Sequence, residues 1–92
     1  MTIDWSDEAV LTYNKTIDYL LEEWNADIAE NFETKTNSLL DRLKTHKHLC
    51  PESNIIHLRK CVLHKNTSLI YRVKNDIIEL VAFINNNTEH IF

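Results

Sequence analysis

Residues 55–84 read IIHLRKCVLHKNTSLIYRVKNDIIELVAFI, and this stretch decides the fold. Three runs rich in β-branched and apolar residues alternate with asparagine-containing turns: strands at 55–64, 68–73 and 77–84, with turns at 65–67 and 74–76. Asparagine tolerates a positive φ, so it can take the place of glycine in such turns. Because turns this short make neighbouring strands antiparallel, the stretch predicts a three-stranded meander.

The residues before this stretch predict one strand and two helices. Residues 2–5 alternate apolar and polar side chains, which is typical of a short strand. Residues 7–24 repeat apolar side chains at three- and four-residue steps, and Ser6 can cap this helix. Asn25 breaks the pattern and can cap a second amphipathic helix over 26–46. Two long helices joined by so short a break fold back as an antiparallel hairpin.

The predicted order is therefore β-α-α-β-β-β, in one α+β domain covering residues 1–92. The helical hairpin is expected to pack on one face of an antiparallel sheet, and Pro51 marks the connection between the two halves, residues 46–54. Five aromatic side chains occupy positions that we expect in the core: Trp5, Trp24, Phe32, Tyr71 and Phe83.

Composition excludes several function classes. The 92 residues contain no glycine, which rules out Gly-rich phosphate loops and the dinucleotide-binding fingerprint. The net charge of −4 argues against a nonspecific nucleic-acid binder. The charge is uneven, since residues 1–45 hold four basic and ten acidic residues (−6) and residues 46–92 hold six and four (+2).

The N-terminus carries no basic or apolar signal region, and no apolar run approaches the ~20 residues of a membrane helix. We therefore expect a cytoplasmic protein without membrane partners. Cys50 and Cys61 do not make a disulfide framework. Cys61 is interpreted as a buried free thiol, with a thiol nucleophile beside His57 or His64 as the alternative.

One short segment alternates possible zinc ligands, His46, His48 and Cys50. It lacks the second close pair of ligands that zinc sites use, so the interpretation is exposed loop histidines. No metal and no cofactor are expected.

Three short motifs, in order and spacing, resemble the RelE/ParE toxin superfamily. Tyr19, Glu22 and Trp24 end the first helix, Leu58-Arg59 opens the meander, and residues 70–73 read Ile-Tyr-Arg-Val. The resemblance covers nearly the whole chain and is closest to the ParE branch. It implies a small toxin, of the kind associated with plasmid stabilisation, that a cognate antitoxin neutralises. ParE-like members are associated with inhibition of DNA gyrase, and RelE-like members cleave messenger RNA on the ribosome.

The resemblance also bears on whether the chain is an enzyme. Arg59 falls on a basic position of the RelE-like members, but Ser68 and residues 85–87 fall where those members have arginines. We therefore expect a toxin that binds a protein target such as gyrase and is not an enzyme. The alternatives are an inactive relative and a ribosome-dependent ribonuclease that uses the basic candidates Arg59, Lys60, His64, Arg72 and His90.

A surface for the antitoxin or the target is predicted from side chains of two kinds: Tyr13, Tyr19, Arg59, Lys60, Lys65 and Arg72. The two tyrosines have core packing as their alternative role. The basic residues have cross-strand pairing with Glu79 and its neighbours as theirs.

Overall fold

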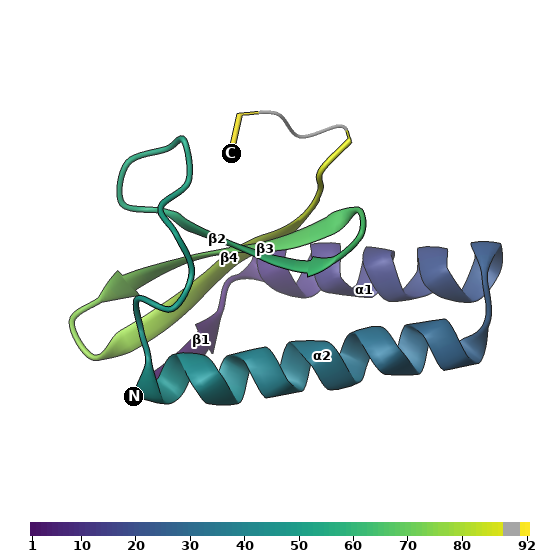
Figure 1. Cartoon of the computed structure of the whole chain (residues 1–92), viewed down its shortest axis with the longest axis horizontal. Coiled ribbons are helices and arrows are strands. Elements are labelled where there is room, and N and C mark those ends of the chain that lie inside the picture. Colours follow the sequence, from purple (N-terminus) through teal and green to yellow (C-terminus); the bar gives the residue numbers. More distant parts are fainter. Residues whose placement is uncertain (88–90) are drawn as a thin grey trace.

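Six elements form two layers, a helical hairpin on a four-stranded sheet (Figure 1). The computed structural model describes residues 1–87 and 91–92. The bounds of the elements are β1 Thr2–Trp5, α1 Asp7–Glu23, α2 Ala26–Thr45, β2 Arg59–His64, β3 Thr67–Lys74 and β4 Ile77–Asn85. The predicted order and the α+β class are confirmed. Among the described residues, no helix is long and apolar enough to cross a membrane.

Side-chain caps define the helical hairpin. The Ser6 hydroxyl accepts from the Ala9 N–H (3.0 Å) and donates to the Val81 carbonyl (2.9 Å), so it fixes the start of α1 on β4. The Asn25 side chain accepts from the Ile28 N–H at 3.0 Å and starts α2. Each cap satisfies an amide that the helix itself leaves unpaired.

The sheet has the order β1-β4-β3-β2. The predicted meander is confirmed, because β3 pairs antiparallel with both β2 and β4. The expectation of a wholly antiparallel sheet is wrong for β1, which pairs parallel with β4. Parallel neighbours need a long connection, and the helical hairpin with the first two meander strands supplies it. The sheet is therefore mixed.

The strand predicted at 55–64 begins only at Arg59. The Leu58 N–H donates to the Ile55 carbonyl at 3.1 Å, and His57 has a φ of 70°, a left-handed conformation that no strand accommodates. The apolar residues Ile55 and Ile56 led to the prediction of a strand, but the Ile56 side chain is 78% exposed. Asn75, with a φ of 57°, takes the turn role expected of asparagine. The other element ends agree with the prediction to within one residue.

The main core lies between the helices and the sheet. Trp5, Tyr13, Phe32 and Phe83 form an aromatic cluster with ring centroids 5.1–6.3 Å apart. Trp24 does not join them, which corrects its assignment to the core. It follows the last turn of α1 at the hairpin bend and is 64% exposed.

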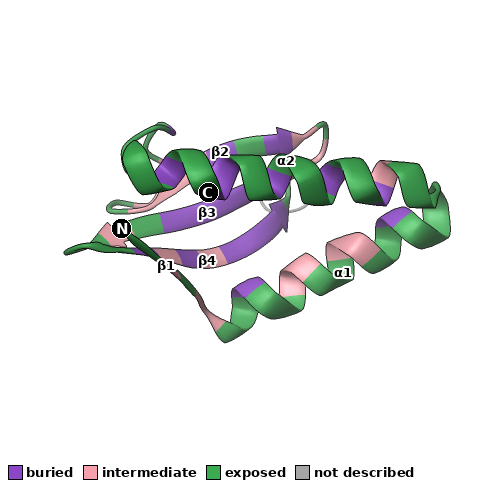
Figure 2. Cartoon of the chain, turned by 90° about the horizontal axis from the view of Figure 1, so that it is seen from below, coloured by how far each residue is buried: buried purple, intermediate pink, exposed green. Residues whose placement is uncertain are grey.

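The two helices contribute unequally to this core (Figure 2). The buried residues of α2 are Ala29, Phe32, Thr36, Leu39, Leu40 and Leu43, whereas α1 buries only Ala9 and Leu20. Much of the apolar surface of α1 therefore stays accessible.

The cysteines are joined, which corrects the prediction of free thiols. Cys50 and Cys61 form a disulfide with a Cα–Cα distance of 5.3 Å. Glu52 forms an antiparallel bridge with Arg59, and the Lys60 N–H donates to the Pro51 carbonyl at 3.0 Å. That register places residue 50 opposite residue 61. A thiol nucleophile at Cys61 is therefore absent from this state.

Candidate functional site: a groove beside helix α1

A groove of about 570 Å³ opens between α1 and the sheet. One wall is α1 and the hairpin bend, and the other is the β2–β3 turn with the end of β4, which lie alongside α1 (Figure 1). Its lining residues are Thr12, Lys15, Thr16, Tyr19, Leu20, Trp24, Ile28, His64, Lys65, Asn66, Thr67, Phe83, Ile84 and Asn85. The Thr12 hydroxyl accepts from the Phe83 N–H at 2.9 Å and holds the two walls together.

The groove combines apolar surface with positive charge. Leu20 and Phe83 are buried in it, while Tyr19 and Trp24 are more than half exposed. The charged side chains among its lining residues are Lys15 and Lys65. Neither lysine forms a salt bridge among the described residues. Such a surface suits a segment that carries apolar side chains flanked by carboxylates.

The structure brings together two of the predicted partner residues, Tyr19 and Lys65, from elements far apart in the sequence. Tyr13 lies elsewhere, because it packs against Phe32 in the aromatic cluster. Burial, and secondarily the carboxylate of Glu33, raises the pKa of the Tyr13 phenol. Sequence reasoning missed Lys15 and assigned Trp24 to the core. For Lys15 the available signal was its position four residues before Tyr19, on the same side of α1. Trp24 lies in line with the apolar stripe, and it is exposed because the helix ends at Glu23.

The remaining predicted basic residues do not share the groove. Lys60 pairs with Ile70 across β2 and β3, on the sheet face that points away from the helices. Arg72 pairs with Glu79 on β4, with Nε–Oε1 at 2.7 Å and an Nη2–Oε1 distance of 2.6 Å. Arg72 therefore forms the cross-strand pair with Glu79 that was the predicted alternative to a partner contact.

Arg59 contributes to a second hollow, of about 360 Å³, under the segment that follows α2. Its Nη1 donates to the Cys50 carbonyl at 2.7 Å, and its Nη2 lies 3.9 Å from a Glu52 oxygen. His48 and His57 also line this hollow, together with Ile56, Leu58 and Val73. Neither histidine was predicted to lie beside Arg59, and His48 reaches this hollow from nine residues before His57.

The ribonuclease candidates therefore do not converge. Arg59 and His64 stand at opposite ends of β2, roughly 16 Å apart at the rise of an extended strand. Lys60 and Arg72 lie on the outer face of the sheet, and His90 lies outside the described residues. Within the described part of the chain, no group of three or more His, Cys, Asp or Glu could hold a metal ion.

No protein-family model and no curated protein sequence matches this chain. Solved structures do match it in fold. A chain of the chromosomal ParDE toxin–antitoxin system from P. aeruginosa superposes with a TM-score of 0.76 at 16% identity, covering 92% of this chain and 95% of that one. A copper-bound mutant toxin from Helicobacter pylori gives 0.68 at 17% identity, with 95% and 96% covered.

The YoeB dimer from Staphylococcus aureus gives a TM-score of 0.62 at 17% identity, covering 89% of this chain and 92% of that chain. YoeB also occurs among the matches in complex with YefM. The chain thus has the RelE/ParE-like toxin fold over nearly its full length, as its sequence resemblance predicted.

Proposed function

We propose that this protein is the toxin of a toxin–antitoxin module, that a cognate antitoxin neutralises it, and that it acts in the cytoplasm by binding a protein target such as DNA gyrase. The observation that carries the proposal is the agreement in fold with the ParDE chain over 92% of this chain, together with an open groove beside α1. Because proteins with one fold can differ in function, the proposal also rests on the surface of this chain.

The groove supplies the surface for neutralisation. Of its lining residues, Tyr19 and Trp24 are more than half exposed, and Leu20 and Phe83 are buried beneath them. Exposed aromatic side chains beside a concave apolar surface are the usual anchors of a peptide partner. Lys15 and Lys65 attract carboxylates of the incoming segment and fix its register.

The basic residues favour a protein target over an RNA substrate. Phosphodiester cleavage needs a base, an acid and a cation near one phosphate. Arg59 and Arg72 are each engaged by a carbonyl or a carboxylate of the chain itself. The helical half, with a net charge of −6, also repels a polyanion.

Expression tests the proposal. The chain is induced in a bacterial host, alone and together with the product of the adjacent gene. We expect growth arrest that the second product reverses, and inhibition of gyrase supercoiling by the purified chain. Unimpaired growth despite verified expression of folded protein would contradict toxicity and would favour an inactive relative.

A ribosome-dependent endoribonuclease is the second candidate, and one observation favours it. His48 and His57 share a hollow with Arg59, so two imidazoles and a guanidinium lie in one place. These groups could serve as base, acid and phosphate ligand. A cleavage assay on translating ribosomes decides between the candidates. Cuts in the ribosomal A site that Arg59→Ala abolishes would replace the gyrase proposal.

A further inference from the structure

The connector, residues 46–58, depends on one buried side chain. It contains no helix or regular strand, and all its residues except Cys50 are exposed or intermediate. Cys50 is bonded to Cys61, which is 3% exposed on the helix-facing side of β2. The disulfide therefore ties the connector to the core between the helices and the sheet, whereas Leu58 at the end of the connector packs on the smaller cluster of the outer sheet face.

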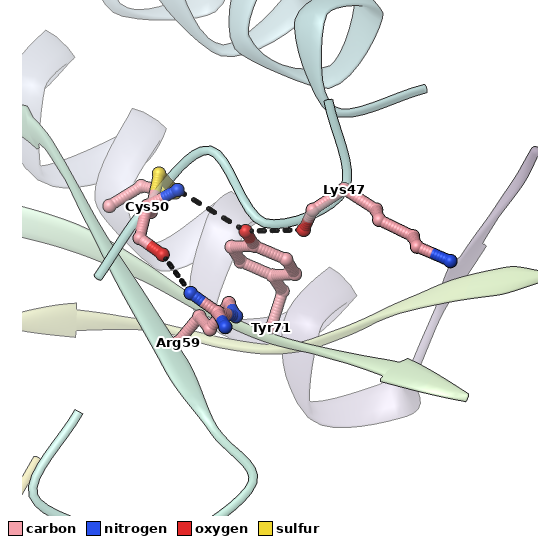
Figure 3. The surroundings of a disulfide bond; sticks show 5 residues. Lys47, Cys50, Arg59 and Tyr71 are labelled. Atoms are coloured by element: carbon pink, nitrogen blue, oxygen red, sulfur yellow. Dashed lines mark hydrogen bonds between the residues drawn. A yellow bond between two sulfur atoms is a disulfide. The ribbon is translucent and has the colours of Figure 1, made fainter. Parts of the chain in front are cut away.

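The polar contacts around this link are also centred on Cys50 (Figure 3). The hydroxyl of Tyr71 on β3 donates to the Lys47 carbonyl (2.8 Å) and accepts from the Cys50 N–H (3.4 Å). Arg59 Nη1 donates to the Cys50 carbonyl. Three side chains from two strands, Arg59 and Cys61 of β2 and Tyr71 of β3, thus meet the connector at Cys50.

The other anchors of the connector are the packing of Leu58 on the outer sheet face and a few isolated backbone hydrogen bonds. The Lys60 N–H donates to Pro51 (3.0 Å), the Ser53 N–H to Leu58 (2.8 Å) and the Asn54 N–H to Phe92 (3.0 Å). Segments held by few buried apolar contacts open locally without unfolding the rest of a protein. The core under α2 does not include the connector apart from Cys50.

We propose that Cys50 and Cys61 are a reversible redox site, and that their disulfide is a clamp that holds the connector and Arg59. A dithiol reductant, such as a thioredoxin-type protein, is the co-reactant. One of its thiolates attacks a sulfur of the disulfide, and the leaving cysteine takes up a proton. Its second thiol then resolves the mixed disulfide, so the reductant is oxidised and both cysteines become thiols.

Reduction of the disulfide changes the surroundings of the Arg59 guanidinium. When Cys50 is released, the Arg59 guanidinium loses the carbonyl that it binds, and Glu52 moves away with the connector. Arg59 then becomes available to an anionic group of a partner. This biological consequence rests on the proposed function, whereas the clamp itself does not. Cytosolic disulfides are usually transient or redox-sensing, which suits such a site.

Hydrogen exchange on the purified full-length chain tests the clamp without reference to toxicity. Oxidised protein is compared with protein reduced by dithiothreitol, and with the variant Cys50→Ser/Cys61→Ser. We expect amides of residues 46–58 that are protected in the oxidised form to exchange at least about tenfold faster in both reduced forms. Amides of α2, β3 and β4 should stay protected.

Two outcomes would overturn the proposal. Unchanged protection of the connector after complete thiol release would mean that its hydrogen bonds suffice to hold it. Complete loss of protection throughout the chain would mean that the whole fold, and not the connector alone, requires the disulfide. An absorbance titration of the Tyr71 phenol, identified by its loss in Tyr71→Phe, is the second readout. Release of the connector should change the pKa of this phenol, because the connector both buries it and donates a hydrogen bond to it from Cys50, and an unchanged pKa would contradict the release.

Discussion

The groove beside α1 and the hollow under the connector stand at opposite ends of β2 and differ in how they are built. The groove lies between regular elements, and Lys15 and Lys65 line it without a carboxylate partner among the described residues. The hollow lies under an irregular segment, and its guanidinium is bound by the chain itself. A cation on the surface is therefore informative only when its partners are known, because a paired arginine is not free to bind another anion.

The largest expected effect is a loss of stability on changing the connector, with no change in binding at the groove. Removing the cross-link with Cys50→Ser/Cys61→Ser should lower the free energy of unfolding by about 3 kcal/mol, because a closed loop of this length constrains the unfolded chain. Urea unfolding measures the change. The affinity of the groove for the antitoxin should remain unaltered, and a parallel loss of affinity would contradict the independence of the two regions.

The groove should depend on its exposed aromatic rim. Trp24→Ala should weaken antitoxin binding by about 2 kcal/mol, roughly 30-fold, because a large aromatic side chain at a concave site is a typical binding anchor. Calorimetry measures the affinity. Ile56→Ala is the matched control, since Ile56 is an exposed apolar residue on the connector. Equal losses in the two variants would argue against the groove.

Reversing the charge of the two lysines that line the groove tests its electrostatic role. Lys15→Glu/Lys65→Glu should lower antitoxin affinity about tenfold at low salt, mainly through slower association, and the loss should shrink as salt is added. Lys35→Glu is the control, because Lys35 is exposed on α2 and does not line the groove. An effect of Lys35→Glu as large as that of the double variant would point to net charge alone.

The stability contributed by Tyr71, which binds the connector, should fall at alkaline pH. Burial raises the pKa of the Tyr71 phenol above 10.0, although the Cys50 hydrogen bond and the Arg59 charge oppose the rise. Because the folded pKa exceeds the unfolded one, this contribution to stability is full below pH 10 and is lost as pH rises through the folded pKa. Tyr71→Phe should cost about 1 kcal/mol at pH 7 and should lose less stability above pH 10. Identical pH profiles would contradict this assignment.

The smallest effect is expected on the outer sheet face. Arg72→Gln removes a partly exposed ion pair with Glu79 and should change unfolding free energy by about 0.5 kcal/mol. Thermal unfolding measures it, and antitoxin affinity should not change. A large loss of antitoxin affinity would show that Arg72 belongs to the surface that binds the antitoxin.

Much of the fold was predictable because its signals are local. The apolar stripes of 7–24 and 26–46 predicted both helices within a residue, and Asn75 adopts the turn conformation expected of it. The site was harder to predict. Tyr19 and Lys65 were named, but the groove that unites them depends on the distance between α1 and the β2–β3 turn, which no periodicity encodes.

By itself, the sequence determined the element order, the helical hairpin, the meander and the uneven charge, since each follows from local spacing and composition. The tertiary structure alone decided the parallel placement of β1, the exposure of Trp24 and the pairing of Cys50 with Cys61. These features depend on which segments far apart in the chain come to lie side by side. The register that brings Glu52 to Arg59 is one such contact, and it places the two cysteines opposite each other.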